Sequence, residues 1–367
     1  MKAEFIDHRD IRWKNFLQRT KHDFYHLPEY VELAAADEDA MPVAFYAEEG
    51  AAACLIPLLI RHLPSALNAQ PNWCDCASPY GYSGILISPS QERLHSFLEA
   101  FCQCARARGI VTAFVRLHPL FALEQSTLGK FGQLVRHGQT VYIDLSESEE
   151  SIWAQMSTNH QRNIKKLTRL GFHVSLDDWS RFHDFIAIYH STMRRVEAAD
   201  LYFFSSEYFE DLRKKLGNRM HLLCVLTDNN ELTAAGLFVV SNSIVQYHLG
   251  GTATHYLPLA PSKMMLDFAW RWAKAQSYDV LHLGGGVGGA EDSLFHFKAG
   301  FSPARGQFYT YRIVVDELKH ATLQHDAQLT RRGGSVAPSD FFPAYRHLQV
   351  QNNSLEEERH PALGNDL

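Results

Sequence analysis

Residues 206–240 read SEYFEDLRKKLGNRMHLLCVLTDNNELTAAGLFVV, and their pattern repeats one that begins at residue 28. Ser206–Glu210 (SEYFE) resembles Pro28–Glu32 (PEYVE). Both segments predict short helices, because their apolar residues recur at steps of three and four. The chain therefore contains an approximate internal duplication.

A β-hairpin is predicted after each of these helices. The turns carry Gly50 in the first copy and Asn229-Asn230 in the second, residue types that tolerate the positive φ of tight turns. The predicted strand pairs are 43–46 with 52–60, and 221–226 with 232–240. The matching hairpins extend the repeat over most of each half.

Each hairpin leads to a glycine-containing strand end, then a helix, then a further strand. In the first half these segments are 80–84, 92–108 and 110–117; in the second they are 248–251, 262–276 and 280–283. This order matches the GNAT fold. The predicted fold class is α/β (α+β), with two tandem GNAT-like subdomains, each a mixed, mostly antiparallel sheet flanked by helices.

We expect residues 1–145 to form the N-terminal subdomain and residues 146–318 the C-terminal one, with the active site. A helix from about Ser151 to Leu170 opens this second half. Residues 319–367 form a C-terminal tail, of which 339–346 docks back through aromatic side chains and the end is disordered.

The bulk composition narrows the function classes. A net charge of −6 means that contact with nucleic acid or anionic lipid needs a local basic patch. The six cysteines predict reduced thiols in a cytoplasmic protein, and the two Cys-x-Cys pairs lack the spacing of zinc knuckles, so no metal is expected. The longest apolar run, 51–60, is too short to span a bilayer, so no integral membrane segment is expected, although the inner membrane face is a possible location.

The strongest motif is HLGGGVGG at 282–289, with five glycines directly after a predicted strand. Such a cluster is typical of tight turns or of close approach of the backbone to a ligand. The alternative is a mobile surface loop. No Gly-Lys-Ser/Thr follows, so the motif is not a P-loop.

Lys298 follows this loop, between Phe297 and Gly300-Phe301. A lysine with aromatic neighbours can lie close to a reaction centre and stabilise a developing negative charge. The alternative is a lysine that extends from the edge of the core into water. The residues leave both open.

Two further segments could bind anionic groups. On a helix, Arg162, Lys165 or Lys166, and Arg169 share one face, which suits phosphates but is also typical of a solvated surface. Arg195 precedes an aromatic run at 202–209, which could line an acceptor pocket; the alternative is packing, with Arg195 in a structural ion pair.

These segments resemble the Fem (FemAB) family of the GNAT-like superfamily, which includes aminoacyl-tRNA-dependent ligases of peptidoglycan bridges. The resemblance covers about residues 20 to 315. It is carried by the following segments: DFYHLPEY at 23–30, SPYGYSG at 78–84, RNIKK at 162–166, TMRR at 192–195, and LGGG at 283–286 with Phe297-Lys298 and Phe301.

The resemblance implies transfer of an aminoacyl group from tRNA, or of an acyl group from a thioester, to an amine. It implies that Lys298, paired with Phe297, stabilises the oxyanion and that Arg195 lies near a phosphate of the acceptor. The expected substrate-binding residues are Arg195, Arg162, Lys165, Tyr80, Tyr82, Tyr247, Gly284, Gly285 and Gly286. No cofactor is expected, and the expected partners are charged tRNA as donor and a phosphate-bearing small-molecule or lipid-linked acceptor.

The expected reaction is direct attack of a neutral amine on an activated carbonyl, because no Ser-His-Asp or Cys-His order predicts a covalent intermediate. Asp292, Glu291 or His296 could accept the proton. The first alternative is a conventional acyl-CoA-dependent enzyme, but 255–262 has prolines where such enzymes hold pyrophosphate on glycines. The second is a non-catalytic protein that binds a precursor.

Overall fold

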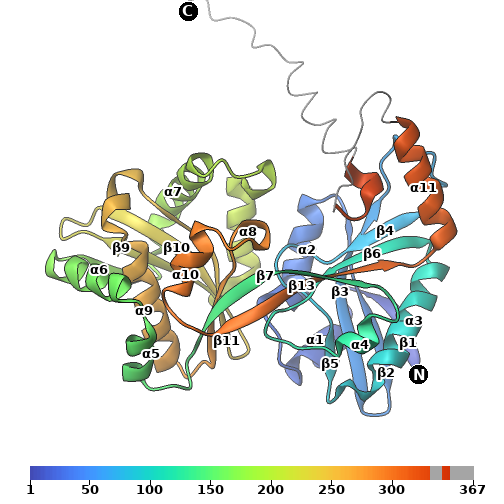
Figure 1. Ribbon diagram of the computed structural model, residues 1–367, viewed down its shortest axis with the longest axis horizontal. Coiled ribbons are helices and arrows are strands. Elements are labelled where there is room, and N and C mark those ends of the chain that lie inside the picture. The colour runs from blue at the N-terminus through green and yellow to red at the C-terminus, as the bar shows by residue number, and fades with distance from the viewer. Residues whose placement is uncertain (331–340, 348–367) are drawn as a thin grey trace, which may run out of the picture.

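The computed structural model describes residues 1–330 and 341–347, whose strands form one continuous sheet (Figure 1). From one edge to the other its order is β1-β2-β3-β4-β6-β13-β7-β12-β11-β10-β9-β8, with β5 paired to β3. The strand bounds are β1 Lys2–Asp7, β2 Met41–Glu49, β3 Ala52–His62, β4 Cys74–Ala77, β5 Leu86–Ser88, β6 Ile110–Arg116, β7 Gln133–Asp144, β8 His173–Leu176, β9 Met220–Leu226, β10 Leu232–Ser241, β11 Ile244–Thr252, β12 Val280–Gly284 and β13 Arg305–Val314.

Helices cover both faces of this sheet. Their bounds are α1 Ile11–Gln18, α2 Pro28–Asp37, α3 Leu94–Ala107, α4 Gln125–Leu128, α5 Glu149–Gln155, α6 Thr158–Arg169, α7 Phe182–Arg195, α8 Ser206–Leu216, α9 Ser262–Ala275, α10 Ser293–Ala299 and α11 Glu317–Thr330. Within the described residues, the strand pairs are antiparallel except β4–β6 and β11–β12. These two parallel pairs occupy equivalent places in the two halves, so the predicted fold class is confirmed.

The predicted hairpins are present as β2–β3 and β9–β10, but two local predictions were wrong. Residues 80–84 form a turn and a loop rather than a strand end, because Gly81 has φ +96°, far from the extended backbone of a strand. The helix expected over 151–170 is divided into α5 and α6. Ser157 interrupts it: its side chain accepts the His160 N–H and its own N–H donates to the Gly300 carbonyl.

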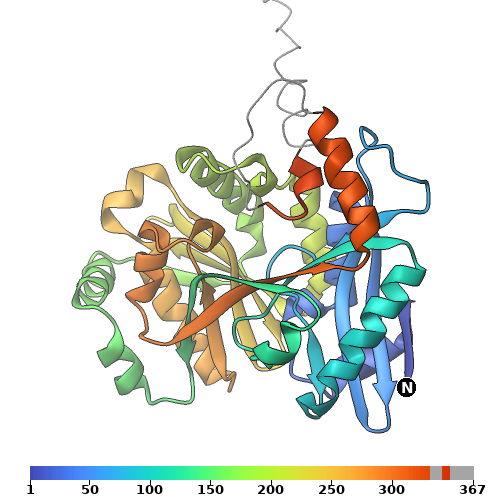
Figure 2. The same cartoon turned by 45° about the vertical axis from the view of Figure 1, so that its right-hand side comes forward.

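Strands β7 and β13 cross between the two halves (Figures 1 and 2). The end of β7 pairs with β12 of the second half, whereas β13 pairs with β7 and then, over Thr310–Val314, with β6 of the first half. Sequence analysis placed 305–314 in the second half alone. The division into 1–145 and 146–318 stays a prediction, since the sheet runs through both.

A shared hydrophobic core joins the halves. Helices α1 and α2 of the first half and α7 and α8 of the second contribute to one cluster on the same side of the sheet. The paired helices α2 and α8 also carry an ion pair between Glu32 and Lys215, at 2.7 Å. Helix α3 covers the other face of the first half, and α6, α9 and α10 cover that of the second.

The chain ends against the first half. Leu323 and Ala327 of α11, a helix that sequence analysis did not expect, pack with Val111 of β6 and Tyr345. Tyr345 is fully buried, so the described part of the predicted docking segment does contact the fold. Residues 339–340 and the tail end predicted to be disordered lie outside the described residues. No helix of the described chain is long and apolar enough to cross a membrane.

Candidate active site

The candidate site begins where β11 and β12 part. The two parallel strands pair only over Ile244–Gln246 and Val280–His282. Beyond this point β11 continues beside β10 to Thr252, while β12 stays with β7, where Gly284 pairs with Val141. The two strands therefore diverge at their carboxyl ends and leave an opening in the hydrogen-bonded ladder, the usual place for a site in an α/β sheet.

His282 lies at the base of this opening and is fully buried. Its Nδ1 lies 2.6 Å from Gln246 Oε1 and its Nε2 lies 2.9 Å from Thr140 Oγ1. Because a carbonyl oxygen only accepts, Nδ1 donates to Gln246 and Nε2 accepts from the Thr140 hydroxyl. Burial, together with His118 and Lys298 nearby, holds the pKa of His282 well below its usual value, so the ring is neutral.

The glycine-rich loop after β12 is a built structure. Gly284 has φ +75°, and a Cβ on Gly286 would lie 2.3 Å from Asp292 Oδ1. The Asp292 carboxylate accepts N–H groups from Val287 at 3.0 Å and Phe295 at 2.8 Å, which ties the loop to the start of α10. These contacts hold the loop in a defined conformation, and its role as a binding site stays a prediction.

Lys298 of α10 points back to this loop. Its Nζ donates to the Gly285 carbonyl oxygen at 2.7 Å, and only 8% of the residue is exposed. Burial lowers the pKa of Lys298 to about 8, while the Asp292 charge opposes that shift. The structure thus places a buried, cationic donor beside Gly284 and Gly285, two of the expected binding glycines.

The two tyrosines of the SPYGYSG segment point to different places. Tyr82 reaches the glycine loop, since a Cβ on Gly284 would lie 3.6 Å from its hydroxyl. Tyr80 instead lies edge-on to Tyr202 and Phe204. Its backbone carbonyl accepts from the Tyr30 hydroxyl at 3.0 Å. Of the pair, the structure brings only Tyr82 to Lys298.

Two other predicted residues make packing contacts instead of lining the opening beside Lys298 Nζ. Phe297 packs against His160 and Phe301, and its carbonyl accepts from His160 Nε2 at 2.8 Å, so it anchors α10 to α6. Tyr247 stacks on Phe238 in the core. Both aromatic rings therefore support the fold around the site.

Arg195 lies at the end of α7. It donates to Thr254 and Thr192 at 3.1 and 3.2 Å, and no carboxylate of the described residues pairs with it. The ion pair considered as an alternative is therefore not present within these residues. Arg195 is half-buried beside the end of β11, with its cation available to an anionic ligand.

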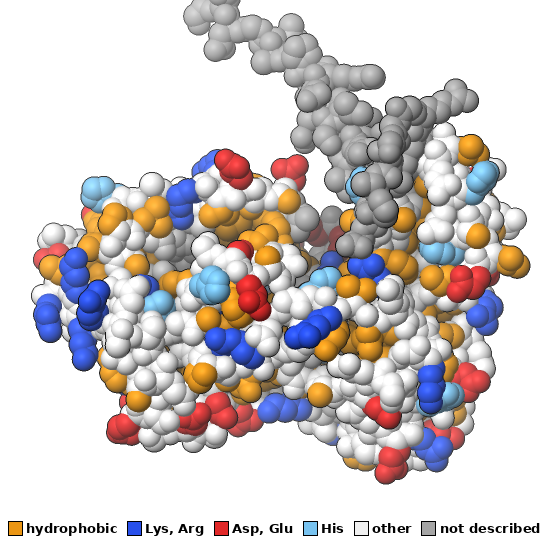
Figure 3. Space-filling model, viewed as in Figure 1, with side chains coloured by type: hydrophobic (Ala, Val, Ile, Leu, Met, Phe, Trp, Pro, Cys, Tyr) orange, Lys and Arg blue, Asp and Glu red, His pale blue; other side chains and the backbone are white. Residues whose placement is uncertain are grey.

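The basic face expected around Arg162 and Lys165 is present on α6. Both are exposed, as are Lys166 and Arg169, and the helix contains no acidic residue. Lys and Arg side chains gather over α6 at the left of the molecule (Figure 3). His160 of the same helix contacts α10, so this basic face is rigidly connected to the element that carries Lys298.

A buried pair that no sequence motif indicated lies near Tyr82. His118, in the loop after β6, donates from Nε2 to Asp23 Oδ2 at 3.0 Å, and its ring lies 6.1 Å from that of Tyr82. Burial raises the pKa of Asp23 to about 7 and lowers that of His118 to about 3. The two residues are 95 positions apart, so no local pattern could connect them.

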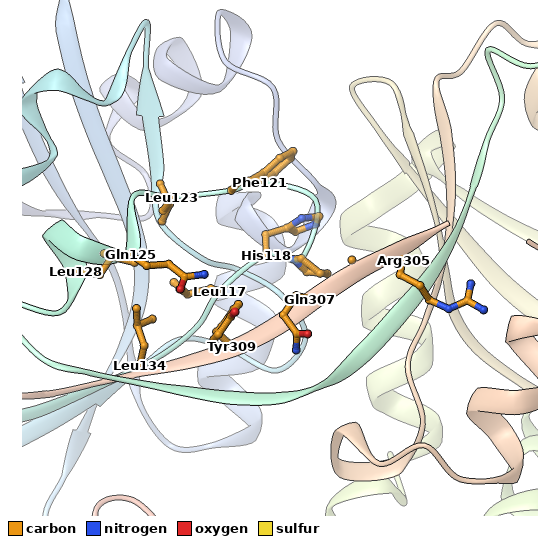
Figure 4. A pocket seen from close by; sticks show the side chains of 13 residues that line it. Leu117, His118, Phe121, Leu123, Gln125, Leu128, Leu134, Arg305, Gln307 and Tyr309 are labelled. Atoms are coloured by element: carbon orange, nitrogen blue, oxygen red, sulfur yellow. The ribbon is translucent and has the colours of Figure 1, made fainter. Parts of the chain in front are cut away.

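His118 also lines a pocket of about 240 Å³ between the loop after β6 and β13 (Figure 4). The wall is polar and apolar in about equal parts, with polar groups from His118, Gln125, Arg305, Gln307 and Tyr309. Lys298 does not line this pocket. The pocket ends at Gly306, which lies next to Thr140, and Thr140 lies next to Gly285. The Thr140 side chain therefore separates the pocket from the glycine-rich loop.

The proton acceptors suggested by the sequence differ in their surroundings. Although burial alone would raise the pKa of Asp292, the N–H groups of Phe295 and Val287 hold it below its usual value. Asp292 is therefore a structural carboxylate and a poor base. Glu291 and His296 are exposed at the edge of the loop, where either could exchange protons with water.

The comparisons with known proteins agree with this geometry. Residues 154–298 match the family model of the acetyltransferase (GNAT) domain. Among solved structures, FemX superposes with a TM-score of 0.64 at 12% identity, covering 84% of this chain and 97% of FemX. L-PGS from Bacillus licheniformis gives 0.55 at 12% identity, covering 89% of this chain and 98% of its own.

The C-terminal domain of a putative lysylphosphatidylglycerol synthetase from Agrobacterium fabrum gives a TM-score of 0.52 at 14% identity, with 89% of this chain and 98% of that chain covered. No curated protein sequence matches this chain. The family match and the fold confirm the resemblance to Fem-type proteins of the GNAT-like superfamily. Residues 154–298 match the GNAT acetyltransferase domain, and the chain as a whole has the fold of FemX.

Proposed function

We propose that the protein is an N-acyltransferase of Fem type, which transfers an aminoacyl group from aminoacyl-tRNA to an amine of a cell-envelope precursor. The acceptor would be a peptidoglycan or polysaccharide precursor that bears phosphate, free or linked to lipid. Charged tRNA occurs in the cytoplasm, and a lipid-linked acceptor would be met at the inner membrane face.

The observation that carries this proposal is the placement of Lys298. A neutral amine attacks the carbonyl carbon of the donor ester, and the carbonyl electrons move to its oxygen. The Lys298 ammonium, held by Gly285 at 2.7 Å, would stabilise that oxyanion. Collapse of the intermediate expels the donor's alcohol, and the amine proton leaves to water or to an exposed group.

The basic face of α6 supports a nucleic-acid donor. The protein carries a net charge of −6, so the molecule as a whole does not attract a polyanion. On α6, by contrast, four exposed cations stand without an acid. Such a face binds phosphates with a strong dependence on salt.

The alternative donor is an acyl-CoA, favoured by the match of residues 154–298 to an acetyltransferase domain. A diphosphate needs free N–H groups at a helix N-terminus. Before α9, Pro258 and Pro261 have none, and the N–H groups of Lys263 and Met264 already donate to carbonyls at 3.1 and 2.9 Å. Because these N–H groups are already bonded within the protein, they support the tRNA donor over CoA.

The name of one similar protein points the same way. The Agrobacterium protein is called a lysylphosphatidylglycerol synthetase, a name that describes a lysine attached to a lipid. An aminoacyl group and an envelope acceptor are the features that we carry over. The pocket beside His118, one side chain from Gly285, would hold part of the acceptor.

The test is donor binding, because it needs no knowledge of the acceptor. Purified protein is mixed with acetyl-CoA, longer acyl-CoAs, or a pool of charged tRNA, and followed by thermal shift and gel retardation. Retardation of charged tRNA that high salt abolishes, without a shift from CoA, is the expected result. A shift with acyl-CoA alone would overturn the tRNA proposal. A Lys298→Ala variant that keeps full function in cells would favour a non-catalytic precursor-binding protein.

A further inference from the structure

We propose that Tyr82, from the first half of the chain, is a catalytic residue that donates a second hydrogen bond to the oxyanion beside Lys298. This inference rests on the proposed acyl transfer and adds to it a specific role for the first half. The reaction centre would then be built from both halves, although only residues 154–298 match the acetyltransferase domain.

The two donors converge on one point of the backbone. A Cβ added to Gly284 would lie 3.4 Å from Lys298 Nζ and 3.6 Å from the Tyr82 hydroxyl. No other atom outside Gly284 and its chain neighbours lies within 4 Å of that Cβ position, so a small group has room there. A carbonyl oxygen that lies between the two groups, closer to each than this Cβ position, would accept a hydrogen bond from both.

The Gly285 carbonyl oxygen accepts from Lys298 Nζ at 2.7 Å and so fixes the ammonium beside Gly284. Within residues 1–330 and 341–347 no acceptor takes the hydrogen of the Tyr82 hydroxyl, which is therefore left to donate. Burial raises the pKa of Tyr82 to about 12, so the hydroxyl stays protonated at neutral pH.

The Tyr82 ring is held rigidly. It lies edge-on to His282 at 5.4 Å, Phe308 at 5.3 Å and Tyr25 at 5.8 Å between ring centres. The preceding Gly81 leaves no room for a side chain, because a Cβ there would lie 2.0 Å from the Tyr25 ring. A donor fixed in this way needs no reorganisation during the reaction, which is what makes oxyanion donors effective.

The chemistry remains a direct transfer. As the amine adds, the carbonyl electrons move to oxygen, which accepts from the Lys298 ammonium and the Tyr82 hydroxyl. Tyr82 keeps its proton throughout. When the carbonyl reforms and the donor's oxygen or sulfur departs, both bonds weaken again. Because they strengthen only in the transition state, they raise kcat rather than affinity.

The experiment compares Tyr82→Phe with wild type in transfer from charged tRNA, or from acyl-CoA if that proves to be the donor, to hydroxylamine as the amine. Loss of one oxyanion donor lowers kcat about 10²- to 10³-fold. We expect that loss with KM unchanged. The matched control is Tyr25→Phe, which removes a hydroxyl from the adjacent ring and should leave kcat within about threefold.

The outcomes separate this inference from the proposed function. Equal kcat for Tyr82→Phe and wild type overturns the inference and leaves the acyl transfer standing. A raised KM with normal kcat also overturns it, because it makes Tyr82 a binding residue. Absence of transfer by wild type from every donor overturns both. If Tyr82→Phe fails to fold, 3-fluorotyrosine at position 82 keeps the ring and changes the hydroxyl acidity, and an unchanged kcat then sinks the inference.

Discussion

Lys298 Nζ donates to the carbonyl oxygen of Gly285 at 2.7 Å, across a turn that buries the lysine. Burial of this cation lowers the stability of the folded protein. Its pKa falls to about 8 in the folded protein from 10.5, so the unfolded chain binds more protons between those values. The resulting loss in the free energy of unfolding is fully present below about pH 8 and disappears as the pH rises to about 10.5.

Lys298→Met should remove that pH dependence. The stability of wild type should rise relative to the variant by on the order of 3 kcal/mol between about pH 7.5 and about pH 10.5. Urea denaturation of both proteins at the two pH values measures it, since other titrating groups cancel in the difference. A constant difference would mean that the folded lysine titrates as in water.

The rate of transfer should fall as the pH rises through about 8. Only the ammonium form of Lys298 stabilises an oxyanion, and its pKa of about 8 sets where that form is lost. With an acceptor amine of low pKa, such as hydroxylamine, the falling limb stands clear of the acceptor's own ionisation. A profile of kcat that stays flat to about pH 10 would contradict the role of Lys298.

Gly284→Ala should reduce transfer strongly, because the methyl group would occupy the space between Lys298 and Tyr82. Gly288→Ala is the matched control. Both glycines have positive φ, +75° and +60°, so each substitution costs about 1 kcal/mol of backbone strain, but nothing lies within 4 Å of the Gly288 Cβ. The midpoint temperature of thermal unfolding should fall by a similar amount in both variants, whereas kcat should fall only in Gly284→Ala. Equal losses of kcat would attribute the effect to strain in the loop.

Local patterns explain what could be predicted from the sequence. The hairpins β2–β3 and β9–β10 follow from continuous apolar runs and turn residues that lie next to each other in the chain. The glycine cluster and Lys298 are also close together in the sequence. The division of the helix at Ser157 was missed because its cause, the Gly300 carbonyl, is far away in the sequence.

The relation between the halves could not be predicted in the same way. Strand β13 pairs with β6 and β7, which lie far from it in the sequence. No pattern within the residues of β13 identifies these two strands as its neighbours. The same holds for the site, where His118 meets Asp23 and Tyr82 meets Gly284 only after both halves have folded. Local pattern identified the glycine loop and Lys298, and the family resemblance added Tyr82, but only tertiary contacts bring Tyr82 to Gly284.

The basic face of α6 should dominate donor binding if the donor is tRNA. We expect the triple variant Arg162→Gln, Lys165→Gln, Arg169→Gln to lower affinity for charged tRNA. The salt slope should also fall by about one unit for each tRNA phosphate that the variant no longer neutralises. Fluorescence anisotropy at several salt concentrations measures both quantities.

A control triple with the same change in net charge uses exposed cations elsewhere: Lys130→Gln, Lys214→Gln, Arg219→Gln. Its salt slope should match that of wild type. If both triples weaken binding equally, the attraction comes from overall charge, and α6 is no more than a solvated surface.

The end of the described chain should contribute measurably to stability through Asp75. This carboxylate is fully buried and accepts from Arg61 at 3.0 Å, from Arg346 at 2.5 and 2.9 Å, and from the Tyr345 hydroxyl at 3.1 Å. Arg346→Met leaves the Arg61 and Tyr345 bonds in place, so we expect a loss of about 1–2 kcal/mol in the free energy of unfolding.

Asp75→Ala should cost more, about 3–5 kcal/mol, because it leaves the Arg61 and Arg346 cations without their shared buried carboxylate. The double variant tests whether the two act as one unit. If they do, adding Arg346→Met to Asp75→Ala costs little further, since the bond to Arg346 is already absent. Fully additive losses would instead mean that Arg346 stabilises the protein through its bond to the His62 carbonyl, at 2.6 Å, and that Asp75 serves Arg61 and Tyr345 alone.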